Sequence, residues 1–419
     1  MQVSQMAETL IGSEIIKLAA EIKQKMAAGA EIYNFTIGDF DPQVFPIPQV
    51  LEQEIIAAYE QKQTNYPPAE GIAELRTAVA NFTHKYQGLE FPASSILIGG
   101  GARPMIYSVY ATLLDPGDTV LFPVPSWNNN HYSHLMRCKS IYITTSPESN
   151  FMPRASDIAA CISQATLLAL CSPLNPTGTV FDKEELAKIC EVILAENEQR
   201  KLDGRKPVYL LYDQIYWVLT FGTTQHFDPV SLNPKMREYT IFIDGASKCF
   251  AATGIRVGWA MGPEPIMNKM KSILSHIGAW SPKAEQIAVA NFLNNDAAVE
   301  SYLQEFKAEV EYRLNGLYEG LTALKSEGYG VDVIAPQAAI YLTVKFDLTG
   351  KVTKEGKTLL TTPDVTSYLL EEAGLAVVPF SAFGASISSP WYRLSVGTCR
   401  REDVALALAK LKTALQGLS

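Results

Sequence analysis

The chain has little that would mark a secreted, membrane-bound or nucleic-acid-binding protein. Its 419 residues include no apolar run of transmembrane length, and the N-terminus lacks a basic segment followed by a continuous apolar stretch. We therefore expect neither a membrane span nor a signal peptide. A formal net charge of −9 at pH 7 disfavours a phosphate backbone as a ligand, so nucleic acid is not an expected partner.

Cysteine is scarce and follows no pattern. There is no CxxC pair and no Cys/His spacing typical of a metal site. We expect no bound metal and, because nothing suggests a disulfide framework, reduced thiols in a cytoplasmic protein. The cysteines number six: Cys138, Cys161, Cys171, Cys190, Cys249 and Cys399.

The common nucleotide-binding fingerprints are also missing. In the glycine-rich run "GGGARPMI", residues 99–106, Pro104 stands where GxGxxG requires its last glycine, and no GK[ST] follows. A nicotinamide-dependent dehydrogenase and a P-loop enzyme are therefore disfavoured.

The chain does contain the pattern of an α/β protein. Apolar residues make up 47% and charged residues 19%, and 419 residues exceed the usual size of one core, so we expect two packed regions. Short apolar runs alternate with helical segments, which predicts a mostly parallel sheet with sites at the carboxyl ends of its strands. The runs are "SILIGG", "TVLFPVP", "SIYITT", "LLALCSP", "PVYLLYD", "YTIFID" and "RVGWAMG".

Candidate ligand-binding groups follow the first of these runs. The N–H groups of Gly101, Ala102 and Arg103 would lie at a helix start, where they could bind a phosphate, although such a turn is often a simple connection. Trp127 follows the second run and could stack on a flat ring or belong to the core.

Further candidates follow the later runs. Asn175, in "NPTG", and Asp213 could each be only a turn residue or a helix cap. Tyr216 comes three residues after Asp213. Lys248 lies among small and apolar residues, so it either extends its ammonium to solvent or acts as a desolvated amine.

Together these groups are what a phosphorylated pyridine aldehyde would need. Its phosphate needs N–H, hydroxyl and guanidinium donors, for which Ser247 and Arg256 are available besides the helix start. Its ring nitrogen needs a carboxylate, and its aldehyde needs a lysine whose pKa is lowered.

The motifs then resemble those of a known family. "GASKCFAATGIRVG", residues 245–258, combined with "NPTG" and D-x-x-Y upstream, resembles the class I/II aminotransferases, which are fold-type-I enzymes dependent on pyridoxal phosphate. The resemblance extends from "NFTIGDFDP", residues 34–42, to "YRLSVGT", residues 392–398. It implies an α/β fold with a large cofactor domain over residues 46–295 and a smaller α+β domain from residues 1–45 and 296–419.

The resemblance also implies a role for each candidate. Lys248 would form a Schiff base with pyridoxal 5'-phosphate and then act as catalytic base, and Asp213 would pair with the ring nitrogen. Asn175 and Tyr216 would form hydrogen bonds with the ring oxygen, and Trp127 would stack on the ring face. The phosphate would be bound by Gly101, Ala102, Arg103, Ser247 and Arg256. Arg393 and the backbone at Gly38 would bind the α-carboxylate of the substrate, which Asn175 would also contact. Tyr216 would belong to the catalytic residues together with Lys248 and Asp213. Tyr66 resembles the tyrosine that reaches the neighbouring subunit's phosphate, which implies a homodimer.

The activity implied is transfer of an amino group from an L-amino acid to a 2-oxo acid. A lyase for C–S bonds or eliminations would use the same groups, and a non-catalytic regulatory protein that binds the cofactor is the third alternative. The amino donor is left open, because the aromatic residues Tyr341, Phe383, Trp391 and Tyr392 could line the site or belong to the core.

Some positions depart from the family pattern. Many relatives have glycine where Phe380 stands, which leaves the loop beside the substrate uncertain. His131 lies one residue later than a supporting histidine of some members. The roles of His276, Trp280 and Lys283, in a variable segment, are also left open.

Overall fold

A seven-stranded sheet forms the centre of the protein in a computed structural model that describes residues 3–10, 12 and 14–419. The strand order is β2-β8-β7-β6-β5-β3-β4, and β8 runs antiparallel to both β2 and β7, whereas the pairs among β3 to β7 are parallel. Each of the seven apolar runs forms one strand. The inner strands are covered on both faces and are apolar along their whole length, whereas β4 lies at the edge of the sheet and is partly exposed. The strands are β2 (Ile96–Gly99), β3 (Thr119–Val124), β4 (Lys139–Thr144), β5 (Leu167–Cys171), β6 (Tyr209–Asp213), β7 (Thr240–Gly245) and β8 (Gly258–Met261).

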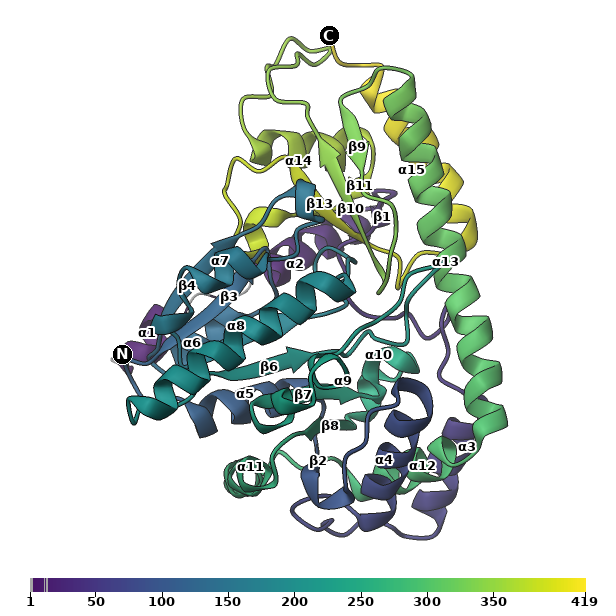
Figure 1. The fold of residues 1–419 in the computed structure, drawn as a ribbon. Coiled ribbons are helices and arrows are strands. Elements are labelled where there is room, and N and C mark those ends of the chain that lie inside the picture. Colours follow the sequence, from purple (N-terminus) through teal and green to yellow (C-terminus); the bar gives the residue numbers. More distant parts are fainter. Residues whose placement is uncertain (1–2, 11, 13) are drawn as a thin grey trace.

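Helices cover both faces of this sheet (Figure 1). Alternate residues of β6 show the two layers: Leu211 packs in the cluster that includes residues of α5 and α11, and Leu210 packs in the cluster that includes α4, α8 and α12. The helices of this part are α3 (Gln49–Glu60), α4 (Ala73–Gln87), α5 (Ala102–Leu113), α6 (Asn129–Leu135), α7 (Ala155–Ala159), α8 (Lys183–Leu202), α9 (Pro229–Leu232), α10 (Ala246–Cys249), α11 (Glu264–His276) and α12 (Lys283–Leu293).

The two ends of the chain meet in a second group of elements. A four-stranded antiparallel sheet has the order β12-β13-β10-β9, and β1 pairs in parallel with β11. The elements are α2 (Glu14–Ala27), β1 (Tyr33–Asn34), α13 (Asp296–Ser326), β9 (Val331–Val333), β10 (Tyr341–Phe346), α14 (Thr362–Glu372), β11 (Leu375–Ala376), β12 (Val378–Pro379), β13 (Trp391–Ser395) and α15 (Arg401–Leu415). The short helix α1 (Gln5–Thr9) lies instead beside α6 (Figure 1), where Nε2 of His134 lies 2.9 Å from the carbonyl oxygen of Met6.

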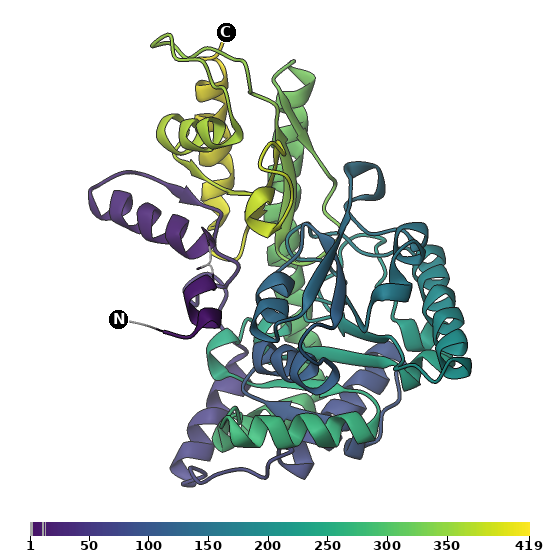
Figure 2. The same ribbon diagram turned by 90° about the vertical axis from the view of Figure 1, so that its left-hand side faces the viewer.

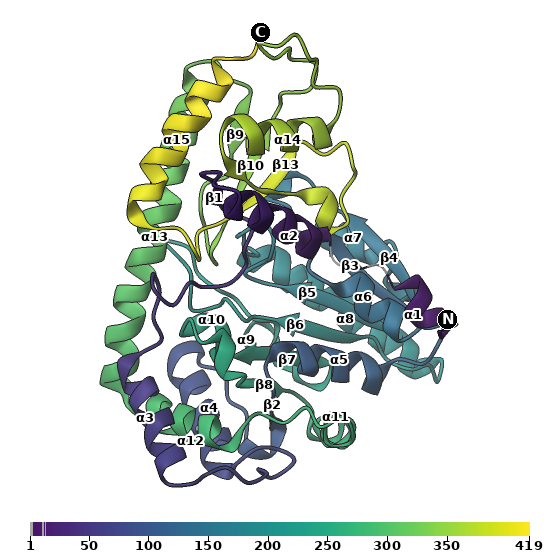
Figure 3. The same cartoon turned by 180° about the vertical axis from the view of Figure 1, so that it is seen from behind.

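Long-range packing holds this group together. Helix α13 runs along one side of the molecule and connects the region of α12 to β9 (Figures 1 and 3). The N-terminal helix α2 lies beside the C-terminal elements (Figure 2), where Ile22 packs with Leu370 of α14 and Ala376 of β11. No helix in the described ranges is long and apolar enough to cross a membrane.

Several helices begin where the sequence provides a cap. Asp182 accepts a hydrogen bond from the N–H of Glu185 at the start of α8, and Thr361 accepts one from Asp364 at the start of α14. These side chains replace the hydrogen bonds that the first-turn N–H groups lack within a helix. Helix α5 differs, because its N-cap is Gly101, which has φ +98° and no side chain that could cap the first turn.

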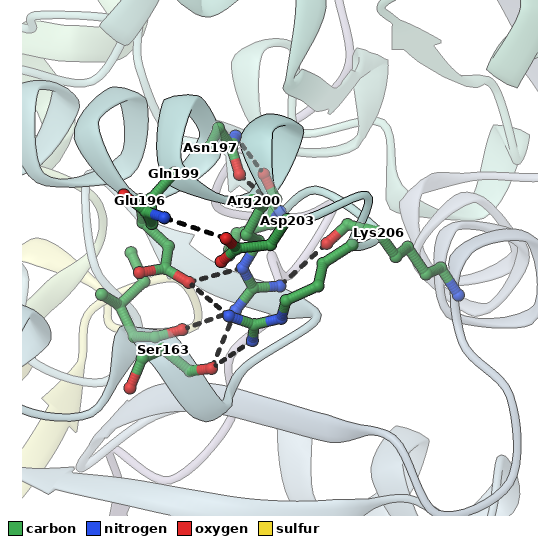
Figure 4. A network of polar contacts seen from close by, with 10 residues as sticks. Ser163, Glu196, Asn197, Gln199, Arg200, Asp203 and Lys206 are labelled. Carbon is green, nitrogen blue, oxygen red and sulfur yellow. Dashed lines mark hydrogen bonds and ion pairs between the residues drawn. The ribbon is translucent and has the colours of Figure 1, made fainter.

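A buried arginine joins the end of α8 to the turn at residues 162–163 and to the segment before β6 (Figure 4). Arg200 is 4% exposed, and its Nε lies 2.6 Å from Oε1 of Glu196. Its Nη1 donates to the carbonyl of Lys206, and its Nη2 donates to the carbonyls of Ile162 and Ser163. One side chain thus satisfies three buried or half-buried carbonyls and one carboxylate.

Replacing Arg200 with methionine should destabilise the fold by about 3 kcal/mol, because the carbonyl of Lys206 loses a donor and Glu196 keeps only the longer ion pair of 3.7 Å with Arg205. Chemical unfolding followed by circular dichroism measures the change. The matched control is Lys201→Met, at the exposed next position of α8, which should change stability by less than about 0.5 kcal/mol. Equal midpoints for the two variants would contradict the structural role of Arg200.

Candidate active site

A cavity of about 590 Å³ lies at the carboxyl ends of β3, β5, β6 and β7, where the segment 36–39 and β13 meet the large sheet. This is the edge at which ligands bind in open parallel sheets. Most of the predicted site residues line it: Gly38, Ala102, Arg103, Trp127, Asn175, Asp213, Tyr216, Ser247, Lys248, Arg256 and Arg393.

Lys248 lies on α10, directly after β7, and is half-buried. Its Nζ donates a hydrogen bond of 2.7 Å to the carbonyl of Gly38. Desolvation lowers the pKa of this amine to about 8; the carboxylate of Asp39 opposes the shift, and nearby guanidinium groups add to it. An amine with such a pKa is available as a nucleophile and base near neutral pH.

Asp213 ends β6, and its Oδ1 accepts a hydrogen bond of 3.1 Å from the N–H of Ile215. Burial raises the pKa of this carboxyl to about 6, and the bond from Ile215 partly offsets the increase. A desolvated carboxylate at the wall of a cavity is suited to pair with a cationic group of a ligand.

The start of α5 forms a cradle with Arg256. The Nη2 of Arg256 donates to the carbonyl of Gly100 over 2.8 Å, and its Nη1 donates to that of Thr253 over 2.6 Å. A Cβ at Gly101 would overlap this guanidinium and displace it, and the φ of +98° at this position favours glycine. Free N–H groups at the helix start and a fixed guanidinium together suit a phosphate.

Arg393, on β13, is 1% exposed and held from several sides. Its Nη1 donates to Oδ1 of Asn175 over 3.0 Å, and its Nη2 donates to the carbonyl of Thr36 over 2.6 Å. The guanidinium carbon lies 4.7 Å from the ring centre of Tyr341 and 4.8 Å from that of Phe383. The Nε is buried and has no acceptor in the part of the chain that the structure describes.

Tyr216 and Trp127 complete the walls. The hydroxyl of Tyr216 lies 2.6 Å from that of Tyr341, and burial raises the pKa of Tyr216 well above its ordinary value. Trp127 has the guanidinium of Arg103 at 5.3 Å from its ring centre.

Two predicted residues lie outside the cavity wall. The N–H of Gly101 donates to the carbonyl of Gly99 over 2.7 Å, so the prediction that this N–H binds a phosphate is wrong, and Ala102 and Arg103 are the predicted N–H donors that line the cavity. Tyr66 is 81% exposed, and its ring lies 5.1 Å from that of Trp280 on the outer surface. Within one chain, therefore, Tyr66 does not reach the site.

The residues left open in the sequence lie elsewhere. His276 is exposed, His131 is half-buried on α6, and the Nζ of Lys283 donates to Asn65. Phe380 is fully buried and packs against Phe151, with ring centres 5.1 Å apart, so it belongs to a core cluster and not to the cavity wall.

The aromatic candidates divide into two kinds. Tyr341 and Phe383 contact Arg393, as described above. Trp391 packs on Phe151, with ring centres 5.3 Å apart, and the hydroxyl of Tyr392 bonds with Thr362, so both belong to the core.

Sequence reasoning missed some of the wall. Thr36 acts through its backbone carbonyl, which no side chain reveals. Asp39 and Cys171 also line the cavity. Asp39 follows Gly38 in the motif "NFTIGDFDP", so the sequence could have identified its carboxylate as a residue of the site.

Comparison with known proteins agrees with this architecture. The family model for aminotransferases of class I and II matches residues 30–411. The aspartate aminotransferase of Rhizobium meliloti (strain 1021) is 29% identical over 411 residues, which cover 97% of this chain and 94% of the relative. That of Bacillus sp. (strain YM-2) is 29% identical over 382 residues, which cover 90% of this chain and 91% of the relative.

Solved structures show the same fold. The aspartate aminotransferase structure from Rhizobium meliloti superposes with a TM-score of 0.91 at 28% identity and covers all of both chains. The aromatic aminotransferase of Pyrococcus horikoshii OT3 gives a TM-score of 0.82 at 25% identity and covers 94% of this chain and 98% of the other.

The fold and the lysine-containing cavity thus define a fold-type-I transferase with a mostly parallel central sheet. The chain belongs to the class I and II aminotransferase family, and the protein is an aminotransferase.

Proposed function

We propose that this aminotransferase uses pyridoxal 5'-phosphate to move an amino group from an L-amino acid to a 2-oxo acid. The observation that carries the proposal is Lys248, an amine with a pKa lowered to about 8 in the same cavity as Asp213 and Arg393.

The residues present fit this cofactor. The cradle at Gly101 and Arg256, with Ser247 and the N–H groups of Ala102 and Arg103, suits its phosphate. The carboxylate of Asp213 suits its ring nitrogen. The further groups that we assign to it are Asn175 and Tyr216 at the ring oxygen, Trp127 at the ring face and Lys248 at the aldehyde.

Each chain residue then has a distinct part in the reaction. When bound, pyridoxal phosphate supplies an aldehyde for the amino group and a protonated ring that accepts an electron pair. Arg393 binds the α-carboxylate and orients the substrate. The amine of Lys248 takes the proton from the substrate Cα and delivers it to the C4′ atom of the cofactor. Asp213 keeps the ring nitrogen protonated during this transfer.

A panel of amino acids tests this proposal. The purified protein with added pyridoxal phosphate should show a visible absorption band, and a donor should remove the band until a 2-oxo acid restores it. Aspartate and aromatic amino acids come first in the panel, because the relatives are named aspartate and aromatic aminotransferases. Release of ammonia without any need for an oxo acid would instead identify a lyase, and a protein that gains no band would contradict the proposal.

We also propose a homodimer in which Tyr66 reaches the phosphate of the neighbouring subunit. Its support is the exposed aromatic surface that Tyr66 forms with Trp280, and it agrees with the resemblance stated above. Size-exclusion chromatography with light scattering measures the mass of the assembly.

The substitution Tyr66→Phe should weaken pyridoxal phosphate binding about tenfold, because one hydrogen bond to a charged group is lost. Fluorescence titration of the cofactor-free protein measures the dissociation constant. Tyr59→Phe is the control, since this tyrosine donates to Glu285 on the same surface. A monomeric protein, or equal affinities in both variants, would contradict the shared site.

The division into residues 46–295 and residues 1–45 plus 296–419, and a cytoplasmic location, also stay proposals. The first is supported by the separate sheets of the two regions, and the second by six cysteines that are all free thiols.

A further inference from the structure

Tyr341 connects three parts of the site through one buried side chain. Its hydroxyl lies 2.6 Å from that of Tyr216, and its ring centre lies 4.7 Å from the guanidinium carbon of Arg393. A Cβ at Gly38 would lie 2.9 Å from the same hydroxyl, so the loop whose carbonyl accepts from Lys248 packs directly on it.

Backbone hydrogen bonds just before Tyr341 fix it relative to the "NPTG" run that contains Asn175 and to the turn that contains Tyr216. Ala338 N–H donates to the carbonyl of Gly178 over 2.9 Å, and Ala339 N–H donates to that of Leu219 over 2.8 Å. Gly178 belongs to the "NPTG" run and Leu219 to the turn after β6, while Tyr341 itself begins β10. A Cβ at Gly178 would overlap the carbonyl of Tyr341, so the approach is as close as glycine permits.

Register places the ring on Arg393. Tyr341 pairs with Ser395 and Thr343 pairs with Arg393 across β10 and β13, so Tyr341 and Arg393 are diagonal neighbours on one face. The guanidinium therefore lies between the ring of Tyr341 and that of Phe383. Such contacts between a cation and ring faces are strongest when desolvated.

The two hydroxyls share one hydrogen bond, and either oxygen can be its donor. Each phenol has one proton to donate. If Tyr216 donates its proton to the ring oxygen of a bound cofactor, Tyr341 must be the donor of the pair. A hydrogen bond donated to Tyr216 makes Tyr216 a stronger donor in turn.

We propose that Tyr341 is a positioning residue with two separable roles: its hydroxyl strengthens the hydrogen bond from Tyr216 to the cofactor, and its ring holds Arg393 for the substrate carboxylate. This inference rests on the proposed function and adds to it a connection between the cofactor ring and the substrate-binding arginine.

The pH dependence of the visible absorption of the holoenzyme tests the first role. A hydrogen bond donated to the ring oxygen lowers the affinity of that oxygen for the proton that it shares with the Lys248 nitrogen. Tyr341→Phe should therefore raise the midpoint of the absorption change by about 0.5 to 1 pH unit. Tyr216→Phe should raise it more, and the double variant should shift it less than the sum of the two.

Kinetics separate the second role from the first. Tyr341→Phe keeps the ring, so KM for the amino acid should stay within about twofold while kcat falls about threefold to tenfold. Tyr341→Leu removes the ring as well and should raise KM about tenfold. Tyr392→Phe is the matched control, because it removes a buried hydroxyl from the same sheet whose partners are Thr362 and Thr366, and it should leave the midpoint and KM unchanged.

The outcomes distinguish this inference from the function beneath it. A midpoint that moves in Tyr216→Phe but not in Tyr341→Phe would overturn the role of the hydroxyl and leave the proposed function standing. An unchanged KM in a folded Tyr341→Leu protein, checked by its unfolding temperature, would overturn the role of the ring. If the wild-type protein gains no absorption band with pyridoxal phosphate, the proposed function and this inference fail together.

Discussion

The substitution Lys248→Ala should lower kcat for amino-group transfer by about 10⁴-fold or more, because it removes both the covalent attachment point and the catalytic base. The cradle at Gly101 and the carboxylate of Asp213 are unchanged, so the variant should still bind pyridoxal phosphate. Borohydride reduction followed by peptide mass analysis provides a measurement independent of turnover. It should attach the cofactor to Lys248 in the wild-type protein and to no lysine in the variant.

The pH dependence of cofactor capture follows from the pKa of Lys248. The ordinary pKa of a lysine is 10.5, and desolvation lowers that of Lys248 to about 8. Only the neutral amine attacks an aldehyde, so the capture rate should rise about tenfold per pH unit below pH 8 and level off above it. Stopped-flow absorbance of the cofactor-free protein measures this rate.

Two results would contradict the role of Lys248. One is turnover within tenfold of the wild type in Lys248→Ala. The other is a capture rate that still rises steeply at pH 10, as an ordinary lysine would give. Lys269→Ala, at an exposed position of α11, controls for the general loss of a lysine and should behave as wild type.

Local sequence patterns were sufficient for much of the fold. The apolar runs became the strands of the large sheet because buried parallel strands need no alternation of polar residues. Polar residues directly after these runs, such as Asp213 and Lys248, lie together at one sheet edge because parallel strands end there. Their placement is observed, while their roles stay predictions.

Contacts that depend on register could not be predicted in the same way. Tyr341 and Tyr392 are both buried tyrosines on adjacent strands, yet one contacts Tyr216 and the other Thr366. Strand alternation places them on opposite faces of the sheet, and a shift of one residue in either strand would move its tyrosine to the other face. The sequence does not contain the pairing of β10 with β13, so both tyrosines stayed undecided there.

Phe380 illustrates a different limit. The resemblance left the loop beside the substrate uncertain, because many relatives have glycine where Phe380 stands. The structure places Phe380 in a core cluster with Phe151 and Phe383. Phe383 in turn contacts Arg393, so Phe380 supports the site from behind and does not narrow it. Only the packing of residues far apart in the sequence decides between these cases.

The substitution Asp213→Asn should lower kcat about 10³-fold. An amide keeps the shape of the side chain but lacks the charge that holds a proton on the ring nitrogen. Losing one partner of a buried charge pair costs about 3 to 5 kcal/mol, and each 1.4 kcal/mol is a factor of ten in rate. Single-turnover loss of the visible band after mixing with a donor measures the effect.

The pH dependence gives this prediction a second observable. Burial raises the pKa of Asp213 to about 6 in the cofactor-free protein, so the carboxylate is charged above pH 6 and increasingly protonated below it. Binding of a cofactor with a cationic ring should therefore weaken as the pH falls through 6. The asparagine variant has no such titration, and its affinity should lose this dependence.

Asp244 provides the matched control, because it is also a buried aspartate near the end of a neighbouring strand. Burial raises its pKa to about 8, and it accepts hydrogen bonds from Trp217 Nε1 and Gly245 N–H over 2.8 and 2.7 Å. Asp244→Asn keeps the shape of the side chain and loses one acceptor, so it should cost about 1 to 2 kcal/mol of stability yet keep kcat within about threefold. If Asp244→Asn loses as much activity as Asp213→Asn, the loss comes from a general structural effect of removing a buried carboxylate. The pairing of Asp213 with the ring nitrogen would then be wrong.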